Sequence, residues 1–221
     1  MTRRTRGTVV LVAFVGLIAA TVVGPATAPV LDVEVERYLG AAASATVEGR
    51  AYEEPRPRET RETPLPDTTV VLLPRSEALL ARLAAIKAGA RASLGNFRSA
   101  ASAMRHAYEE FESALRAAGG EPLVRLGAVD QAGRFAFESL PQGQWVVLAW
   151  RSVFVDTRTG TIGGRSSRLY TLEAPVEGYR AVSFWVRELT LEPSARQTLE
   201  LTDRNVWFSG VEEVKRTGAG R

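Results

Sequence analysis

Hydrophobic and polar positions alternate most clearly near the middle of the chain, where Phe135 and Phe137 are separated and flanked by polar or small residues. A period of two predicts a strand with one buried face. Turn-forming residues precede this strand at positions 130–133 and follow it at positions 140–143. The mostly apolar segment 144–150 predicts a second, central strand. We interpret the two strands as an antiparallel pair and therefore predict an all-β sandwich.

Further strands are predicted on both sides of this pair. They are residues 47–52, 69–73, 168–173, 181–191 and 197–201, with a last extended piece at residues 206–214. Two polar segments with many Pro or Gly residues, 53–66 and 157–167, are predicted to be exposed loops. Segment 31–39 alternates only weakly, and both a short strand and a helix are compatible with it.

A different period begins at Ser76 and continues to Ala118, in a segment rich in Ala, Leu, Arg and Glu. Apolar residues recur there in steps of three or four, which predicts a helix with one apolar face. This stripe consists of Leu79, Leu83, Ile86, Ala90, Leu94, Phe97, Ala101, Met104, Tyr108, Phe111 and Leu115. One straight helix would extend about 64 Å, whereas sandwich strands span about 17–20 Å, so the segment must fold back on itself.

We therefore predict an αα-hairpin inserted between the second and third strands of the sandwich. Gly95 and Asn96 are the favoured corner, because glycine commonly ends one helix and asparagine caps the next. Gly89 is the competing corner, and Ser76 is the expected N-cap of the first helix.

The central pattern resembles the carboxypeptidase regulatory-like domain. The matching residues are Asp130, Gly133, Phe135, Phe137, Leu140, Pro141, Gly143 and Trp145. Two other strands of that family are matched by residues 47–52 and 64–72, with Asp67 at a position where the family usually has glycine. The resemblance implies a transthyretin-like or Ig-like antiparallel β-sandwich of the carbohydrate-binding-like group. It implies an accessory domain without a catalytic role, and fold alone does not determine function.

The N-terminus has the features of an export signal. Arg3, Arg4 and Arg6 precede an uncharged apolar run at residues 8–23, and small residues at positions 24–26 offer a cleavage site before Thr27. Three interpretations remain: a cleaved signal, an uncleaved anchor in the inner membrane formed by residues 8–24, and a buried core segment. The first two place the rest of the chain in the periplasm or outside the cell.

The predicted organisation of the 221 residues follows from these segments. Residues 1–26 are the signal or anchor helix and residues 27–44 a linker. Residues 45–215 form the sandwich, with residues 76–118 as the inserted hairpin, and residues 216–221 are a disordered tail. The length fits one domain with an insertion.

Composition and charge exclude several functions. The chain has no cysteine, which excludes disulfides, thiolate zinc sites and cysteine nucleophiles. Lys plus Arg number 28 and Asp plus Glu number 25, and removal of the three N-terminal arginines leaves 28 − 3 = 25 against 25. The exported part is therefore nearly neutral, so nucleic-acid binding is not expected.

No catalytic, metal-binding or cofactor-binding residues are predicted. His106 is the single histidine, and it lies toward the side of its helix opposite the apolar stripe. One histidine without cysteine does not provide the ligand sets of catalytic zinc, and the chain has no G-x-S-x-G nucleophile elbow. Asp130 is expected to accept backbone hydrogen bonds within its turn.

The tryptophans are the remaining candidates for ligand contact. Trp145 belongs to the strand motif and is expected in the core, whereas Trp150, Trp185 and Trp207 either stack on a sugar or pack in the core or beneath the hairpin. The sequence thus predicts a non-catalytic structural or protein-binding module, with the amphipathic hairpin as the partner surface. The alternative is a carbohydrate-binding module that uses exposed tryptophans.

Overall fold

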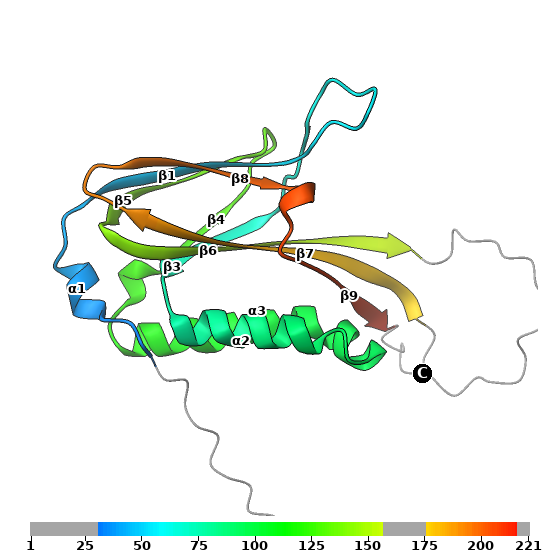
Figure 1. The fold of residues 1–221 in the computed structure, drawn as a ribbon, viewed down its shortest axis with the longest axis horizontal. Coiled ribbons are helices and arrows are strands. Elements are labelled where there is room, and N and C mark those ends of the chain that lie inside the picture. The colour runs from blue at the N-terminus through cyan, green and yellow to red at the C-terminus, as the bar shows by residue number, and fades with distance from the viewer. Residues whose placement is uncertain (1–30, 157–175, 216–221) are drawn as a thin grey trace, which may run out of the picture.

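The computed structural model describes residues 31–156 and 176–215, and its strands form two sheets that face each other (Figure 1). The predicted signal or anchor, the loop at 157–167, the strand at 168–173 and the tail at 216–221 lie outside these residues. Within the described ranges, no helix combines the length and the apolar content that a membrane span requires. The mainly β sandwich predicted from the alternating pattern is confirmed.

The first sheet is built around β1 (Ala43–Glu53). β1 pairs antiparallel with β5 (Arg134–Pro141) along most of its length. The last two residues of β1 pair antiparallel with the short β2 (Thr63–Pro64). On the other side β8 (Arg196–Thr202) runs parallel to β1, which is an exception to the expected antiparallel order. The chain crosses from the second sheet at residues 192–195, beside the start of β1, so β8 and β1 begin at the same end.

The second sheet is antiparallel throughout, in the order β4-β3-β6-β7-β9. The long strand β6 lies at its centre, as the apolar run at residues 144–150 predicted. The strands are β3 (Thr69–Pro74), β4 (Arg125–Ala128), β6 (Gly143–Asp156), β7 (Val176–Leu191) and β9 (Phe208–Lys215).

One predicted pairing is wrong: β5 and β6 are not an antiparallel pair, because β5 belongs to the first sheet and β6 to the second. The turn between them crosses the space between the sheets. Ser139 (φ 55°) and Gly143 (φ 145°) both have positive φ at this corner. The crossing lets Phe137 and Trp145 enter the same core from opposite sheets, and the Trp145 Nε1–H donates to the Pro141 carbonyl.

The space between the sheets is filled by large apolar side chains, and Trp145 and Trp185 are the largest that are fully buried. The first sheet contributes Val47, Ala51, Phe135, Phe137, Leu140 and Leu201, and the second contributes Val70, Leu72, Trp145, Val147, Trp185 and Leu189. Each Å² of apolar surface removed from water stabilises the folded state by about 25 cal/mol. This core is therefore the main source of the stability of the fold.

The segment between β3 and β4 is a helical hairpin, as predicted, formed by α2 (Glu77–Gly89) and α3 (Leu94–Ala117). Ser76 caps α2 through the Leu79 N–H. The predicted corner at Gly95 and Asn96 is wrong, because the chain turns at residues 90–93, next to the competing site Gly89. Ser93 caps α3 by accepting from the Asn96 N–H, and this cap starts the second helix before Gly95.

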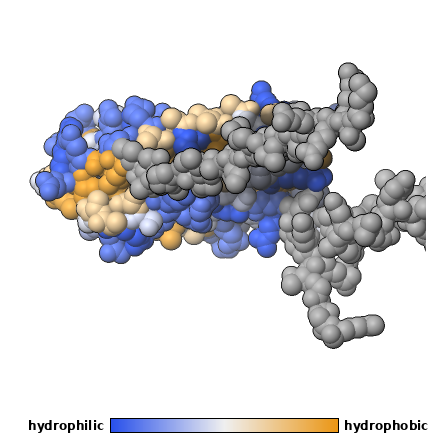
Figure 2. Space-filling view, turned by 90° about the horizontal axis from the view of Figure 1, so that it is seen from below, coloured by the Kyte–Doolittle hydropathy of each residue, from blue (hydrophilic) through white to orange (hydrophobic). Residues whose placement is uncertain are grey.

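The hairpin covers the outer face of the second sheet and makes a third layer (Figure 1). Most of the predicted stripe is buried there, including Ala101, Met104, Phe111 and Leu115, whereas Leu94 is 63% exposed. The Tyr108 ring lies 5.5 Å from that of Trp150 on β6, between ring centroids. Arg105 pairs with Glu212 of β9 at 2.6 Å. The apolar side of the hairpin is therefore part of the core, and hydrophilic residues cover much of its outer side (Figure 2).

Three short helices complete the part of the chain that the structure describes. Segment 31–39 contains α1 (Val35–Leu39), which resolves the two alternatives in favour of a helix. The other two are the 3-10 turns η1 (Glu121–Leu123) and η3 (Asp203–Asn205). Asp67, at the position where the resembled family has glycine, adopts φ 60°, the left-handed conformation that glycine takes most easily.

Candidate ligand-binding surfaces

Trp185 does not present a face to a ligand, and of the two alternatives given for it the structure has core packing. Its side chain is 1% exposed, between the two sheets, and its Nε1–H donates to the Thr202 carbonyl. Trp145 is fully buried, as its place in the strand motif predicted. Both residues alternate onto the inner face of the second sheet, where a large ring fills the core.

Trp150 and Trp207 are half-buried where the hairpin and the second sheet meet. The ring of Trp150 lies between those of Tyr108 and Phe184, with centroid distances of 5.5 and 6.0 Å. The Nζ of Lys87, on α2, lies 4.3 Å from the centre of the Trp207 ring, a cation–π contact. Packing against the hairpin, the alternative to sugar stacking, accounts for both positions.

Many charged residues of the hairpin have polar partners within the molecule. His106 is exposed, and its ring nitrogens lie 3.7 Å from Glu109 and 3.2 Å from Glu110. Glu110 also pairs with Arg82 of α2, which links the two helices.

Asp130 accepts from the N–H groups of Ala132 and Arg134, as expected for its turn. Among the residues that the structure describes, no group of three His, Cys, Asp or Glu side chains is arranged to hold a metal ion.

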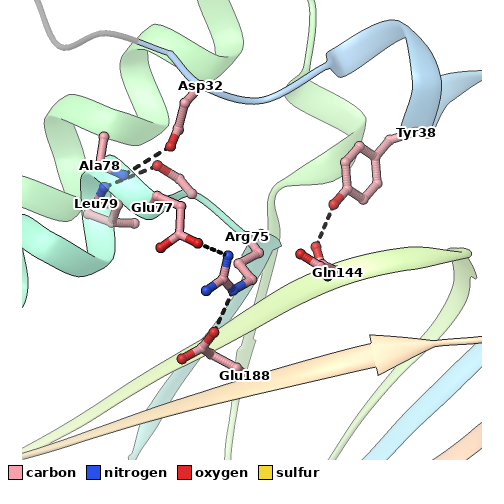
Figure 3. A network of polar contacts seen from close by, with 9 residues as sticks. Asp32, Tyr38, Arg75, Glu77, Ala78, Leu79, Gln144 and Glu188 are labelled. Carbon is pink, nitrogen blue, oxygen red and sulfur yellow. Dashed lines mark hydrogen bonds and ion pairs between the residues drawn. The ribbon is translucent and has the colours of Figure 1, made fainter.

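A network of polar contacts fixes the start of α2 and the helix α1 to one end of the sandwich (Figure 3). The Asp32 carboxylate accepts from the Ala78 N–H and the Ser76 hydroxyl. Burial opposes ionisation, but these hydrogen bonds outweigh it and hold the pKa of Asp32 below its usual value. Arg75 pairs with Glu77 and Glu188, and these carboxylates raise its pKa further.

Tyr38 fastens α1 to the corner between β5 and β6. Its hydroxyl donates to the Gln144 carbonyl, and its ring meets Trp145 edge to face at 5.3 Å between centroids. A Cβ on Gly143 would lie 2.7 Å from the Tyr38 ring, so only glycine allows this approach. Burial raises the pKa of Tyr38 above its usual value.

Beside Tyr38 lies a polar groove made of two adjoining hollows. The first has a volume of about 470 Å³ and the second about 480 Å³, and Gln144 and Thr190 line both of them. We define the α1 groove by the side chains Arg37, Tyr38, Gln142, Gln144, Thr190 and Glu192. These come from α1, from the start of β6 and from the end of β7.

A third hollow, of about 610 Å³, lies on the outer face of the first sheet. Its walls include Glu48, Arg50 and Arg134, with Ala136 and Thr198 between them. Arg50 pairs with Glu62 and lies 4.8 Å over the ring of Tyr52, whose hydroxyl donates to Glu200. This surface is therefore already occupied in part by contacts within the molecule.

The α1 groove is not predicted by the sequence. Tyr38 lies in the segment predicted as a linker. Gln144 and Thr190 belong to predicted strands, where alternation places their side chains on the outer face but does not mark them as part of a binding site. One signal was present in the sequence: Tyr38 is the only aromatic residue between positions 27 and 44. Its contact with Gly143, over a hundred residues away, is a tertiary contact that no local pattern encodes.

No family model matches the chain, and no curated protein matches it. Among solved structures, a Pseudomonas aeruginosa protein described as a candidate carbohydrate-binding protein shares 16% identity at a TM-score of 0.41, over 77% of this chain and 97% of that one. The pilus backbone RrgB of Streptococcus pneumoniae shares 9% identity at a TM-score of 0.26, over 72% of this chain and 40% of that one. These values establish neither a family nor a ligand for the chain.

Proposed function

We propose that the chain is a non-catalytic, exported binding module in which the sandwich and the hairpin form one rigid body. The observation that supports this most is the use of the hairpin: its apolar stripe covers the second sheet instead of remaining exposed. The polar hollows then lie on strands and helix ends that this packing holds in place. Sites on such elements keep their geometry when a ligand binds.

The role of the hairpin in partner binding changes accordingly. A protein partner that binds there would meet the polar outer side, around His106 and Glu109, because the apolar residues face the sheet. Polar contacts of this kind suit a transient interface better than an obligate one. We retain this surface as the proposed protein-binding site.

Export follows from the N-terminal segment in this proposal. Cleavage before Thr27 would release the module into the periplasm or the medium, whereas retention of residues 8–24 would anchor it in the inner membrane. N-terminal sequencing of the mature protein from its own host distinguishes the two, because an anchored chain begins at or near Met1.

Enzymatic turnover is the decisive test of the non-catalytic role. The purified chain is incubated with chromogenic glycosidase, esterase and peptidase substrates, and no turnover above the buffer rate is expected. Turnover that co-elutes with the chain and disappears on substitution of a single acidic or hydroxyl residue would contradict the proposal.

Carbohydrate binding is the second candidate, and the α1 groove favours it. The tryptophans named in the sequence analysis are buried or covered by the hairpin, so the ligand would bind through hydrogen bonds in the groove rather than by stacking on an indole. Glycan-array binding by the chain, tested with groove variants, separates this candidate from a purely protein-binding role.

A further inference from the structure

The α1 groove has walls that are held in place before any ligand arrives. Tyr38 is fixed by its contacts with Gly143, Trp145 and the Gln144 carbonyl. Gln144 and Thr190 lie directly opposite each other on the neighbouring strands β6 and β7. The Tyr38 ring and the strand backbone are therefore preorganised, which lowers the conformational entropy lost on binding.

Four of the six side chains that define the groove have no polar partner within the described part of the molecule. Among residues 31–156 and 176–215, the side chains of Gln142, Gln144 and Thr190 make no hydrogen bond, and Glu192 makes no ion pair. Arg37 has one exposed contact, with Glu34 at 3.8 Å. The neighbouring Arg75, in contrast, is held by both Glu77 and Glu188. The groove thus combines a closed ion-pair cluster with a set of unused donors and acceptors.

The chemistry of these side chains indicates one class of ligand. Each amide side chain both donates and accepts hydrogen bonds, and so does the Thr190 hydroxyl. The charges of Arg37 and Glu192 balance, and Arg75 is compensated by its two carboxylates. A ligand that matches this surface is uncharged and has many neighbouring groups that donate and accept together. Sugar hydroxyls have this property.

We infer that the α1 groove binds a neutral saccharide through hydrogen bonds from Gln142, Gln144 and Thr190. This inference depends on the proposed function, because it assigns a ligand class to the binding module. An acidic saccharide or a phosphorylated ligand would place its charge near Glu188 and Glu192, where the two hollows hold three carboxylates against two cations. The groove therefore discriminates against anions.

The test is calorimetric titration of the purified full chain with maltohexaose, cellohexaose, mannohexaose and chitohexaose, and with hexagalacturonate as the acidic counterpart. The groove variant combines Gln144→Ala with Thr190→Ala. The control variant makes the same two substitutions at exposed positions outside the groove, Gln131→Ala in the turn before β5 and Thr198→Ala on β8. Thermal unfolding of each variant shows that it is folded.

We expect at least one neutral hexasaccharide to bind, hexagalacturonate to bind more weakly, and the groove variant to lose about tenfold in affinity, the loss expected when two hydrogen bonds are removed. The control variant should bind as the wild type does. The inference is overturned if no neutral hexasaccharide binds at millimolar concentration, if hexagalacturonate binds best, or if the groove variant binds as tightly as the wild type.

The failure of the inference and that of the proposed function give different results. Each hexasaccharide is recovered after titration and analysed by chromatography. Intact sugar without binding overturns the groove assignment and leaves the binding module in place, whereas shortened sugar shows hydrolysis and contradicts the non-catalytic role.

Discussion

Gly49 and Phe135 lie opposite each other on β1 and β5, and the Phe135 ring occupies the space that any side chain at position 49 would need. A Cβ on Gly49 would come within 2.0 Å of the Phe135 Cζ. Phe135 belongs to the motif that suggested the sandwich, and Gly49 to its matching opening strand. The two motif halves are therefore adjacent in space, and the Phe135 ring leaves room only for glycine at position 49.

Replacement of Gly49 by alanine should destabilise the fold by about 1–3 kcal/mol, because the added methyl group overpacks the core and displaces the Phe135 ring. Urea unfolding followed by tryptophan fluorescence measures this change. Gly89→Ala is the matched control: nothing lies within 4 Å of the Cβ added there, and Gly89 is the last residue of α2. That substitution should leave the unfolding free energy unchanged or raise it by up to about 1 kcal/mol. Equal effects of the two substitutions would contradict the packing argument.

Asp32 should stabilise the protein in a pH-dependent way. Its carboxylate accepts from the Ala78 N–H at 2.9 Å and so adds to the cap that Ser76 provides. Asp32→Ala should cost about 1 kcal/mol at neutral pH. The pKa of Asp32 is lowered in the folded state, so its contribution is present above the usual value of 3.8 and is lost as the pH falls through the folded pKa.

The measurement is the unfolding free energy of the wild type and of Asp32→Ala from neutral pH down to about pH 2, across the range in which carboxylates titrate. The difference between the two proteins should shrink below pH 3.8. Glu36→Ala, at an exposed position in α1, is the control. A difference that stays constant down to the lowest pH would show that the Asp32 charge does not contribute.

The sequence predicted the sandwich and the hairpin because both follow from local periodicity. The alternation at Phe135 and Phe137 fixes which face of β5 is buried, and the steps of three and four between residues 79 and 115 fix the apolar face of the helices. The turn predicted at residues 130–133 is also present, and Gly133 adopts φ 78° within it.

What the sequence did not predict depends on contacts between distant segments. The turn after Leu140 has the composition of a hairpin, but the choice between pairing and crossing depends on the core that Trp145 enters. Ser93 and Gly95 are both common at helix ends, and the Ser93 cap decided the corner. The α1 groove exists because Tyr38 packs on Gly143, and neither position has a pattern that indicates the other.

Trp150 should act as a packing residue rather than as a sugar-binding one. Its ring contacts Tyr108 of α3 and Phe184 of β7, so Trp150→Ala should lower the unfolding free energy by about 3 kcal/mol through loss of contact area and a new cavity. Saccharide affinity of the folded fraction should stay at the wild-type value. Loss of saccharide binding at unchanged stability would instead support stacking on this tryptophan. Trp207→Ala, which removes the cation–π contact with Lys87, should have a smaller effect on stability.

Tyr108 should make the protein sensitive to alkaline pH. Burial between α3 and the second sheet and a hydrogen bond to Glu112 raise the pKa of Tyr108 far above its usual value of 10.0. In the unfolded chain Tyr108 ionises near the usual value, whereas in the folded protein it stays protonated. Stability is therefore complete below pH 10.0 and falls as the pH rises above it. The expected loss of unfolding free energy from this residue is up to about 1.4 kcal/mol per pH unit.

The measurement is unfolding in urea between about pH 9 and pH 12, around the ordinary tyrosine pKa. The unfolding free energy of Tyr108→Phe should decline less steeply, because this variant keeps the ring against Trp150 and removes the ionising group. Parallel curves for the two proteins would contradict this assignment, because the tyrosines that remain, Tyr38 among them, are present in both.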